Sequence, residues 1–213
     1  MKIHSIGRVA GTVLMTAALF LISMSAAFAQ NTSIKGRWGL GVRGGVGVVT
    51  QDLADSVQGD LGPIVSGNIM YALEDSLLLG LNVEWETHQI NVSSADLGDS
   101  TTISLLPFVE LRGARMANIT PYLSLGVGVN LNSFDLSSTG SAVFSKLDPP
   151  TTVALKIATG ADFFITQNAA LNAEIGWKYN SGDVDACSPF IGCGTDDWNL
   201  SVFSALLGLR YFF

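Results

Sequence analysis

Apolar side chains recur at every second position in eight stretches of this chain, and no other feature limits its fold so strongly. The clearest stretch alternates Leu123, Leu125, Val127, Val129 and Leu131 with Ser124, Gly126, Gly128 and Asn130. A period of two gives a β-strand one apolar and one polar face. The mean hydropathy is +0.39, yet no unbroken apolar run of about 18 residues, the length of a membrane helix, follows residue 29.

Eight strands are therefore predicted, and the connections between them alternate in length. The strands cover about residues 36–48, 63–73, 77–88, 102–112, 123–131, 153–165, 171–179 and 203–213. The short connections are residues 74–76, 113–118 and 166–168, and the long ones are residues 49–62, 90–101, 132–151 and 180–198. Tilted strands of about this length cross a bilayer, with short turns on the periplasmic side and long loops outside. The sequence thus predicts an all-β fold, an eight-stranded antiparallel up-and-down transmembrane β-barrel.

A soluble, lipocalin-like barrel is the alternative fold for the same alternation. Its apolar face would point inward around a ligand, and its polar face would coat the exterior. The polar positions of this chain are rich in Gly, Ser and Asn and poor in Lys and Glu. A narrow lumen suits such residues better than a solvated surface does.

Residues 1–29 have the organisation of a secretory signal peptide. Basic Lys2 and Arg8 precede an apolar run over residues 9–22, and Ala27-Phe28-Ala29 predicts cleavage before Gln30. A membrane-anchoring helix is the alternative, but the run is short for one. Residues 30–213 then form one barrel domain. The whole chain has 18 acidic and 11 basic residues, two of the latter in the leader, which argues against nucleic-acid binding through a basic surface.

Three segments carry a resemblance to a known family. They are Pro121–Val129, the segment Gly160–Thr166 that turns into Leu171–Glu174, and the terminal Arg210–Phe213. Together the segments resemble the small bacterial outer-membrane β-barrels that include the OmpA transmembrane domain and OmpX-like proteins. The resemblance implies a monomer surrounded by outer-membrane lipid and lipopolysaccharide, and an assembly signal at Tyr211 and Phe213 that the barrel assembly machinery reads. Family members include adhesins, protective surface proteins, structural anchors and passive channels, so the fold alone does not select a function.

Inward-facing positions hold a set of charged residues that we expect to form a network in the lumen. The set is Arg43, Glu84, Glu86, His88, Glu110, Arg112, Lys156, Asp162, Glu174, Lys178 and Arg210. Charges inside a narrow tube are tolerated when they are paired and hydrogen-bonded. We expect Arg43 and Arg210, on strands that become neighbours when the barrel closes, to face acids such as Glu84, Glu110 and Glu174. A structural plug is the favoured interpretation, and a gated polar pore is the alternative.

Two further functions remain open for the lumen. Inward positions also hold Leu78, Leu106, Phe108, Phe164, Leu200, Val202 and Leu206, so passage of small, apolar solutes is the second hypothesis. The third is an enzyme of outer-membrane lipid chemistry, built on His88, the one histidine beyond the leader. Enzymes that resemble this architecture have a serine two residues after the histidine, where this chain has Ile90. We therefore assign no catalytic residue and no cofactor.

The long outer connections are acidic and contain both cysteines. Of 13 aspartates, 11 lie there, with Lys146 as the one basic residue. The aspartates fit solvated loops or, alternatively, binding of divalent cations that bridge lipopolysaccharide, although no EF-hand pattern is present and we assign no metal site. Cys187 and Cys193 predict a disulfide in an exported chain. It would hold the tip at residues 190–191 for an extracellular ligand of loop 180–198, or protect the loop from proteases.

Overall fold

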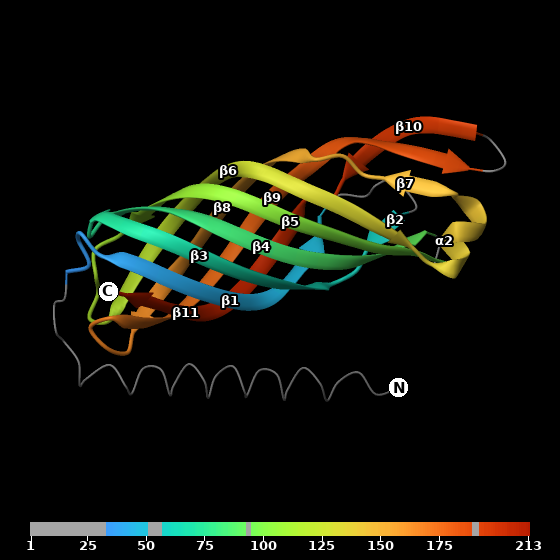
Figure 1. Ribbon diagram of the computed structural model, residues 1–213. Coiled ribbons are helices and arrows are strands. Elements are labelled where there is room, and N and C mark those ends of the chain that lie inside the picture. The colour runs from blue at the N-terminus through green and yellow to red at the C-terminus, as the bar shows by residue number, and fades with distance from the viewer. Residues whose placement is uncertain (1–32, 51–56, 93–94, 189–191) are drawn as a thin grey trace, which may run out of the picture.

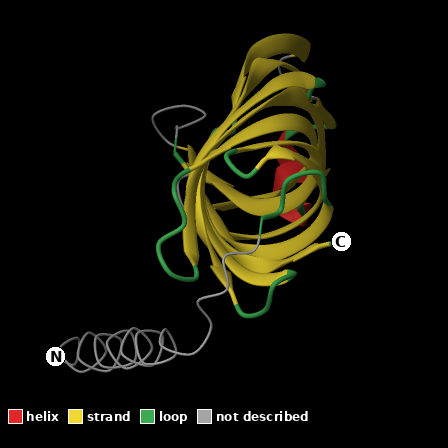
Figure 2. Ribbon diagram, turned by 90° about the vertical axis from the view of Figure 1, so that its left-hand side faces the viewer, coloured by secondary structure: helices red, strands yellow, loops and turns green. Residues whose placement is uncertain are grey.

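The computed structural model describes residues 33–50, 57–92, 95–188 and 192–213, and eight of its strands close a barrel (Figure 1). The barrel strands are β1 (Trp38–Val49), β3 (Gly62–Glu74), β4 (Leu77–Val92), β5 (Ala95–Arg112), β6 (Ile119–Leu136), β8 (Thr152–Phe164), β9 (Ala169–Ser188) and β11 (Val202–Phe212). Each pairs antiparallel with the next, and β11 closes the ring on β1. Figure 2 shows these strands curving around one axis. The predicted fold is confirmed.

The two faces of each strand differ in exposure as the alternation predicts. On β6, Leu125 and Val127 are 50 % and 60 % exposed, whereas inward Asn130 is fully buried. Large apolar side chains cover the outside of all eight strands, and the charged and polar side chains lie inside, together with some buried apolar ones. An apolar outer surface suits hydrocarbon around the barrel. The lipocalin-like alternative, with its apolar face inward, is wrong. Among the described residues, no helix is long and apolar enough to cross a membrane.

Aromatic residues and a change in the outward side chains mark the two edges of the membrane. At the end of the barrel where β11 finishes, the rings of Trp38 and Tyr71 lie 5.1 Å apart. At the opposite end, Trp85, Ile103 and Leu131 face each other across β4, β5 and β6. The next outward-facing row is Thr87, Thr101 and Ser133. The switch from apolar to polar side chains within one row places the outer edge of the hydrocarbon there.

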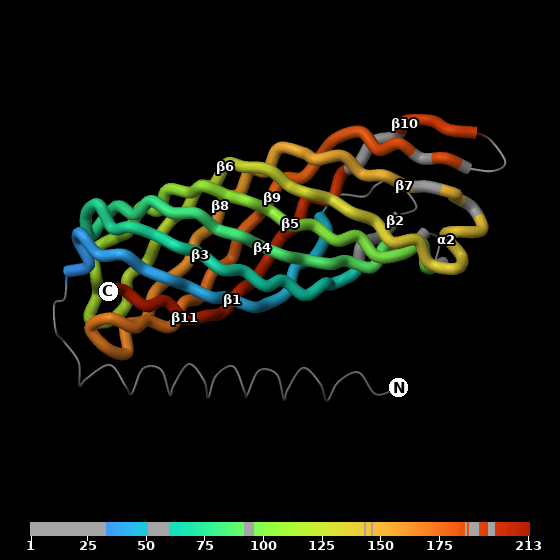
Figure 3. Tube along the Cα trace, viewed as in Figure 1, coloured from blue at the N-terminus to red at the C-terminus, as the bar shows by residue number. Residues whose placement is uncertain are grey.

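Strands continue beyond this outer edge, so the interpretation of residues 90–101 and 180–198 as loops is wrong. The β4–β5 ladder runs on to Val92↔Ala95, and β9 continues to Ser188, where it pairs with β10 (Gly192–Asn199). Three short elements also lie at this end: β2 (Val57–Gly59), α2 (Ser138–Val143) and β7 (Lys146–Asp148). Figure 3 shows the chain of β9, β10 and β6 reaching past β1 and β11. These segments were interpreted as loops because the alternation of apolar and polar residues fades beyond the membrane, although the backbone hydrogen bonds of the strands continue.

The terminal strand is more regular than the sequence suggests. Trp198 and Leu206 share the inward phase, which raises the question of a bulge near residue 200. The register of β11 is unbroken on both sides, because Trp198 belongs to β10, and the chain leaves the ladder at Leu200 and Ser201 before β11 begins. Leu206 packs with Ile64 and Val202 inside the barrel.

One interruption of the barrel wall lies at mid-membrane depth, between β5 and β6. The pairs Leu105↔Val129 and Phe108↔Gly126 are in the same register, but Leu106 and Pro107 between them have no partner in the ladder. Proline cannot donate the backbone hydrogen bond that this position requires. The strands stay close: a Cβ on Gly128 would lie 1.8 Å from the carbonyl oxygen of Leu105, so glycine is required there.

We predict that Leu125→Arg impairs insertion whereas Ser133→Arg on the same face of β6 does not. Leu125 faces hydrocarbon, where an arginine near the midplane costs about 2 to 4 kcal/mol, and the cost approaches zero at the interface. Refolding into phospholipid vesicles, followed by the heat-dependent gel shift of the folded barrel, measures the yield. Equal yields for the two variants would contradict the assignment of the lipid-facing side.

Candidate functional site

The eleven charged positions expected in the lumen are all buried, none more than 9 % exposed. They come from six strands: β1 supplies Arg43, β4 supplies Glu84, Glu86 and His88, β5 supplies Glu110 and Arg112, β8 supplies Lys156 and Asp162, β9 supplies Glu174 and Lys178, and β11 supplies Arg210. Alternation along each strand turns them toward the axis, and the ladder registers bring them together in two clusters that we call the outer and inner clusters.

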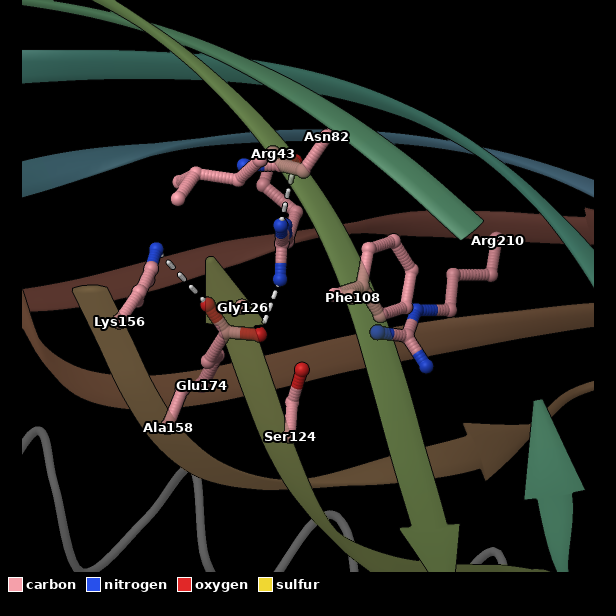
Figure 4. Close-up of a pocket in the computed structure, with 10 residues that line it drawn as sticks. Arg43, Asn82, Phe108, Ser124, Gly126, Lys156, Ala158, Glu174 and Arg210 are labelled. Atoms are coloured by element: carbon pink, nitrogen blue, oxygen red, sulfur yellow. Dashed lines mark hydrogen bonds and ion pairs between the residues drawn. The ribbon is translucent and has the colours of Figure 1, made fainter. Parts of the chain in front are cut away.

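The outer cluster is a chain of alternating charges. Glu84 lies between two ammonium groups, 2.6 Å from Lys156 and 3.1 Å from Lys178. Lys178 is also 2.9 Å from Glu86. Glu174 binds Lys156 at 3.3 Å and Arg43 on its other oxygen, as Figure 4 shows. Every member therefore has an opposite charge on at least one side.

The inner cluster is a square of two arginines and two acids nearer the periplasm. Arg112 Nη1 donates to Glu110 and to Asp162, both at 2.7 Å. Arg210 Nη1 donates to the same two carboxylates at 2.9 Å and 3.2 Å. Tyr122 joins the clusters, because its hydroxyl lies 3.0 Å from Glu174 and its ring lies under the Arg210 guanidinium, 4.6 Å from the centroid.

The pairing partners differ in one respect from those expected. Arg43 contacts Glu174 and Arg210 contacts Glu110, but Glu84 pairs with the two lysines rather than with an arginine. The two clusters contain five carboxylates and five cationic side chains, so they are electrically neutral when His88 is neutral. Breaking one partner of such a buried pair leaves an uncompensated charge.

His88 lies at the outer end of the network, 3 % exposed. Its Nδ1 is 3.2 Å from the backbone carbonyl of Asp60, and because a carbonyl only accepts, Nδ1 carries the proton. Nε2 lies 3.9 Å from a Glu86 oxygen. Nε2, that oxygen and the hydroxyl of Ser100, which pairs with His88 across the ladder, have no hydrogen-bond partner among the described residues. The imidazole faces the lumen interior and not the lipid.

Sequence reasoning missed a neutral polar layer beside the outer cluster. Asn132 and Asn180 exchange amide hydrogen bonds at 2.8 Å and 3.2 Å. Thr152 donates to Asn180 at 2.6 Å, and Ser104 donates to Asn130 at 2.7 Å. Inward phase alone could have identified Ser104 and Asn130, but Asn132, Thr152 and Asn180 lie just beyond the ends of the predicted strands.

Apolar layers lie on either side of the charged region. The inward residues that suggested an apolar passage are almost all packed: Leu78, Leu106, Phe164, Leu200, Val202 and Leu206 are at most 3 % exposed. One layer, at the periplasmic end, contains Ile34, Met70, Leu78, Phe164 and Phe212. Another, at the extracellular end, contains Ile90, Val184 and Leu200. Beside Glu174 and Phe108, the cavity drawn in Figure 4 has a volume of about 20 Å³, room for about one water molecule.

A clasp formed by Asp75 and residues 33–35 holds the start of the described chain at the periplasmic end. Asp75 accepts hydrogen bonds from the Ser33 hydroxyl at 2.8 Å and from the backbone N–H groups of Ile34 and Lys35 at 2.7 Å and 3.0 Å. Partial burial works to raise the pKa of Asp75, but these bonds outweigh it and hold that pKa below its usual value. Ile34 is thereby fixed in the periplasmic apolar layer, a contact that no periodicity predicts.

Beyond the membrane, the predicted disulfide between Cys187 and Cys193 is confirmed. The two cysteines face each other across the β9–β10 ladder. The expected tip residues, Phe190 and Ile191, and the acidic Asp52 and Asp55 lie outside the described residues.

The described aspartates of the outer end are not gathered into a metal site. Exposed Asp99 and Asp135 stand directly opposite each other on β5 and β6. Within the described ranges, no group of three or more His, Cys, Asp or Glu residues is placed to hold a metal ion.

The residues of the expected assembly signal lie at the end of the last strand. Tyr211 and Phe213 point outward, 51 % and 59 % exposed. Their rings are stacked with centroids 6.5 Å apart. The backbone of Phe213 exchanges two hydrogen bonds with Trp38, so this aromatic pair lies beside the seam where the barrel closes.

Comparisons with known proteins agree with this architecture. The family model for the outer membrane protein beta-barrel domain matches residues 15–211, and no curated protein matches the chain. The outer membrane protein OprG from Pseudomonas aeruginosa is similar over 84 % of this chain and 97 % of its own, with 17 % identity and a TM-score of 0.69. Neisserial surface protein A is similar over 83 % and 97 %, with 18 % identity and a TM-score of 0.58. The outer membrane protein AlkL, solved in lipid bilayers, is similar over 88 % of this chain and 94 % of its own, with 17 % identity and a TM-score of 0.57. Identities this low show a common fold and no more.

We predict that Arg43→Met destabilises the barrel by about 3 to 5 kcal/mol, because Glu174 would remain buried with one cation fewer. Adding Glu174→Gln should recover part of this loss, since the unpaired charge is then removed. Urea unfolding in lipid vesicles measures both. Lys35→Met is the control: Lys35 pairs with Glu74 in solvent, and we expect no measurable change. Equal effects of the Arg43 and Lys35 variants would refute a structural role for the lumen pairs.

Proposed function

Because the chain belongs to the outer membrane protein β-barrel family, we propose that it is a structural and surface-interacting protein of the bacterial outer membrane. Residues 1–29 act as a cleaved signal peptide in this proposal. The mature barrel is a monomer held in lipid and lipopolysaccharide, and the assembly machinery recognises Tyr211 and Phe213. Its role is to hold the extracellular strands in place and not to conduct solutes.

The filled lumen is the observation that carries this proposal. Between the periplasmic layer around Phe212 and the extracellular layer around Leu200, the inside is occupied by two neutral charge clusters and a polar layer. An eight-stranded barrel has just enough interior for its side chains. Opening a polar pore would require several buried ion pairs to separate, each of which is costly to break.

The extracellular end supplies the surface for an interaction. The β9–β10 hairpin and β7 form a small sheet beyond the barrel, stiffened by the disulfide. Exposed aspartates such as Asp183 and Asp185 make this sheet acidic, so we propose ligands with positive charge, or lipopolysaccharide bridged through divalent cations. A rigid, charged projection on an inert anchor fits adhesion or surface protection better than transport.

Trimming the hairpin tests the proposal, with Asn-Gly in place of residues 182–198. The ladder pair Ser181↔Asn199 remains and can be closed by this turn. In a deletion strain, the trimmed protein should restore resistance to SDS and EDTA, because the barrel is intact. It should not restore attachment to epithelial monolayers. The paired variant Cys187→Ser/Cys193→Ser is the control, with an intermediate loss expected. Attachment equal to wild type in the trimmed strain would remove the hairpin from the proposed function.

Passage of small apolar solutes is the second candidate, and one observation favours it. The unpaired stretch is Leu106 and Pro107, and Leu106 and the adjoining Phe108 line the small cavity of the lumen. Because two ladder pairs are missing there, β5 and β6 should separate more easily at this point than two strands joined by a continuous ladder.

On this reading, Pro107→Val lowers uptake of N-phenyl-1-naphthylamine to the level of a deletion strain, because valine restores the missing donor. Pro63→Val, at the outer end of the β3–β4 ladder and paired with Val46 of β1, is the control outside the mid-membrane wall and should leave uptake unchanged. Fluorescence of the probe in whole cells gives the initial rate. Indistinguishable rates for wild type and Pro107→Val would eliminate this route.

A further inference from the structure

The small sheet beyond the membrane has an open edge along β10. Every strand of the barrel has a neighbour on both sides, whereas β10, β2 and β7 each pair with one strand among the described residues. β2 and β7 have three residues each, but β10 has eight. Figure 1 shows β10 as the outermost strand at this end of the molecule. The N–H and C=O groups along such an edge can pair with a further strand.

The register of the β9–β10 hairpin shows which backbone groups lie on the open edge. The carbonyl of Cys187 accepts a hydrogen bond from the Ser145 N–H at 2.8 Å, so the backbone groups of Cys187 point toward β7 and away from β10. Cys193, directly opposite, therefore forms a non-hydrogen-bonded pair with Cys187, and their Cα–Cα distance of 4.0 Å agrees. Just beyond the hairpin, Leu200 N–H donates to the Asn180 carbonyl at 2.9 Å, which fits the same alternation.

The direction of the backbone groups alternates along a strand. Cys193, Thr195 and Asp197 therefore turn their N–H and C=O groups to the open edge. Gly194 and Asp196 turn theirs to β9. The register is unbroken over all eight residues of β10, and the strand contains no proline. Bulges and prolines protect many exposed edges against pairing, so the backbone of β10 is open to a partner.

The charge of the hairpin selects the kind of strand that fits this edge. Residues 180–199 contain four aspartates and no lysine, arginine or histidine. Asp183 and Asp185 are exposed on β9, and Asp185 stands directly opposite Thr195. Basic side chains of a strand added beside Thr195 would lie on the face of these two aspartates. A second copy of β10 would instead bring like charges together, which is unfavourable between paired strands.

We propose that the open edge of β10 binds an extended, basic peptide segment of an extracellular protein by β-strand addition. The peptide backbone pairs with Cys193, Thr195 and Asp197. Its lysine or arginine side chains lie on the face of Asp183 and Asp185. Main-chain hydrogen bonds provide the affinity and the charges provide the selectivity. This binding mode rests on the proposed surface role and specifies how the hairpin engages its partner.

The disulfide prepares the edge for this partner. It fixes β10 against β9 before any peptide arrives. A strand that is already ordered loses less conformational entropy on binding than a flexible loop does. The incoming peptide is then the component that becomes ordered.

Amide hydrogen exchange of the folded, oxidised barrel in nonionic detergent tests the proposal. The probe is an eight-residue peptide that alternates Lys and Val, with blocked ends, added at constant ionic strength. Without peptide, we expect the amides of Cys193, Thr195 and Asp197 to exchange faster than those of Gly194 and Asp196. Saturating peptide should slow the first set at least about tenfold, because those amides become hydrogen-bonded, and leave the second set unchanged.

Three results of this experiment would overturn the proposal. One is the absence of saturable binding. Another is binding that protects both sets of amides equally, which would indicate attraction by charge without strand pairing. The third is equal binding of a control peptide that alternates Glu and Val, since that peptide has the same strand pattern and the opposite charge.

Thr195→Pro separates the backbone edge from the charge of the hairpin. Proline removes an outward N–H but no hydrogen bond to β9, and edge strands tolerate it at such positions. We expect it to weaken the Lys-Val peptide at least about tenfold. The matched control, Thr195→Ala, keeps the N–H and should retain the wild-type affinity. Slow exchange at Gly194 and Asp196 verifies that the hairpin is folded, and equal affinities of the two folded variants would contradict strand addition. If Thr195→Pro unfolds the hairpin, the exchange pattern of the wild-type protein decides.

The same variants distinguish this binding mode from the surface role itself. In the deletion strain, Thr195→Ala should restore attachment to epithelial monolayers and Thr195→Pro should not. If Thr195→Pro restores attachment while the trimmed hairpin does not, strand addition is refuted and the surface role of the hairpin stands.

Discussion

Closure of the backbone ladder is the constraint on which the rest of this structure depends. Hydrocarbon offers no hydrogen bonds, so every amide in the membrane needs a partner within the protein. The pairing of β1 with β11 satisfies this requirement by removing both sheet edges. Closing only eight strands leaves an interior no wider than its side chains. The charges in it must therefore bind one another, which explains why Arg43, on the first strand, and Glu174, on the seventh barrel strand, are in contact.

The barrel itself could be predicted from the sequence because one physical rule acts on every residue in the membrane. A two-residue period reports which side faces lipid, and it identified both the strands and the charged residues of the lumen. Specific partners were harder to predict. Glu84 pairs with Lys156 and Lys178 because the stagger between strands brings β8 and β9 to that level. The two-residue period shows whether a side chain points into or out of the barrel, but it does not show how far along the barrel axis that side chain lies.

Beyond the lipid, the two-residue alternation is lost, and the sequence predicts the structure less well there. Thr87, Thr101 and Ser133 are outward-facing like the leucines below them, but polar residues on both faces resemble a loop. The clasp at Asp75 was missed for a different reason. It depends on backbone donors of Ile34 and Lys35, which any residue type except proline provides. Contacts made by the main chain leave little trace in composition.

The closing seam also sets an order of events during assembly. Arg43 is exported early, yet its partner Glu174 follows 131 residues later. Until the last hairpins arrive, Ser66 and Asn82 can accept hydrogen bonds from the arginine, but its charge lacks the carboxylate of Glu174 and must be solvated by water. The unclosed sheet must therefore keep its concave side wet while its convex side is already apolar. The water then leaves and the charges pair when the barrel closes. Docking of the final strand is therefore also the step that removes water from the interior.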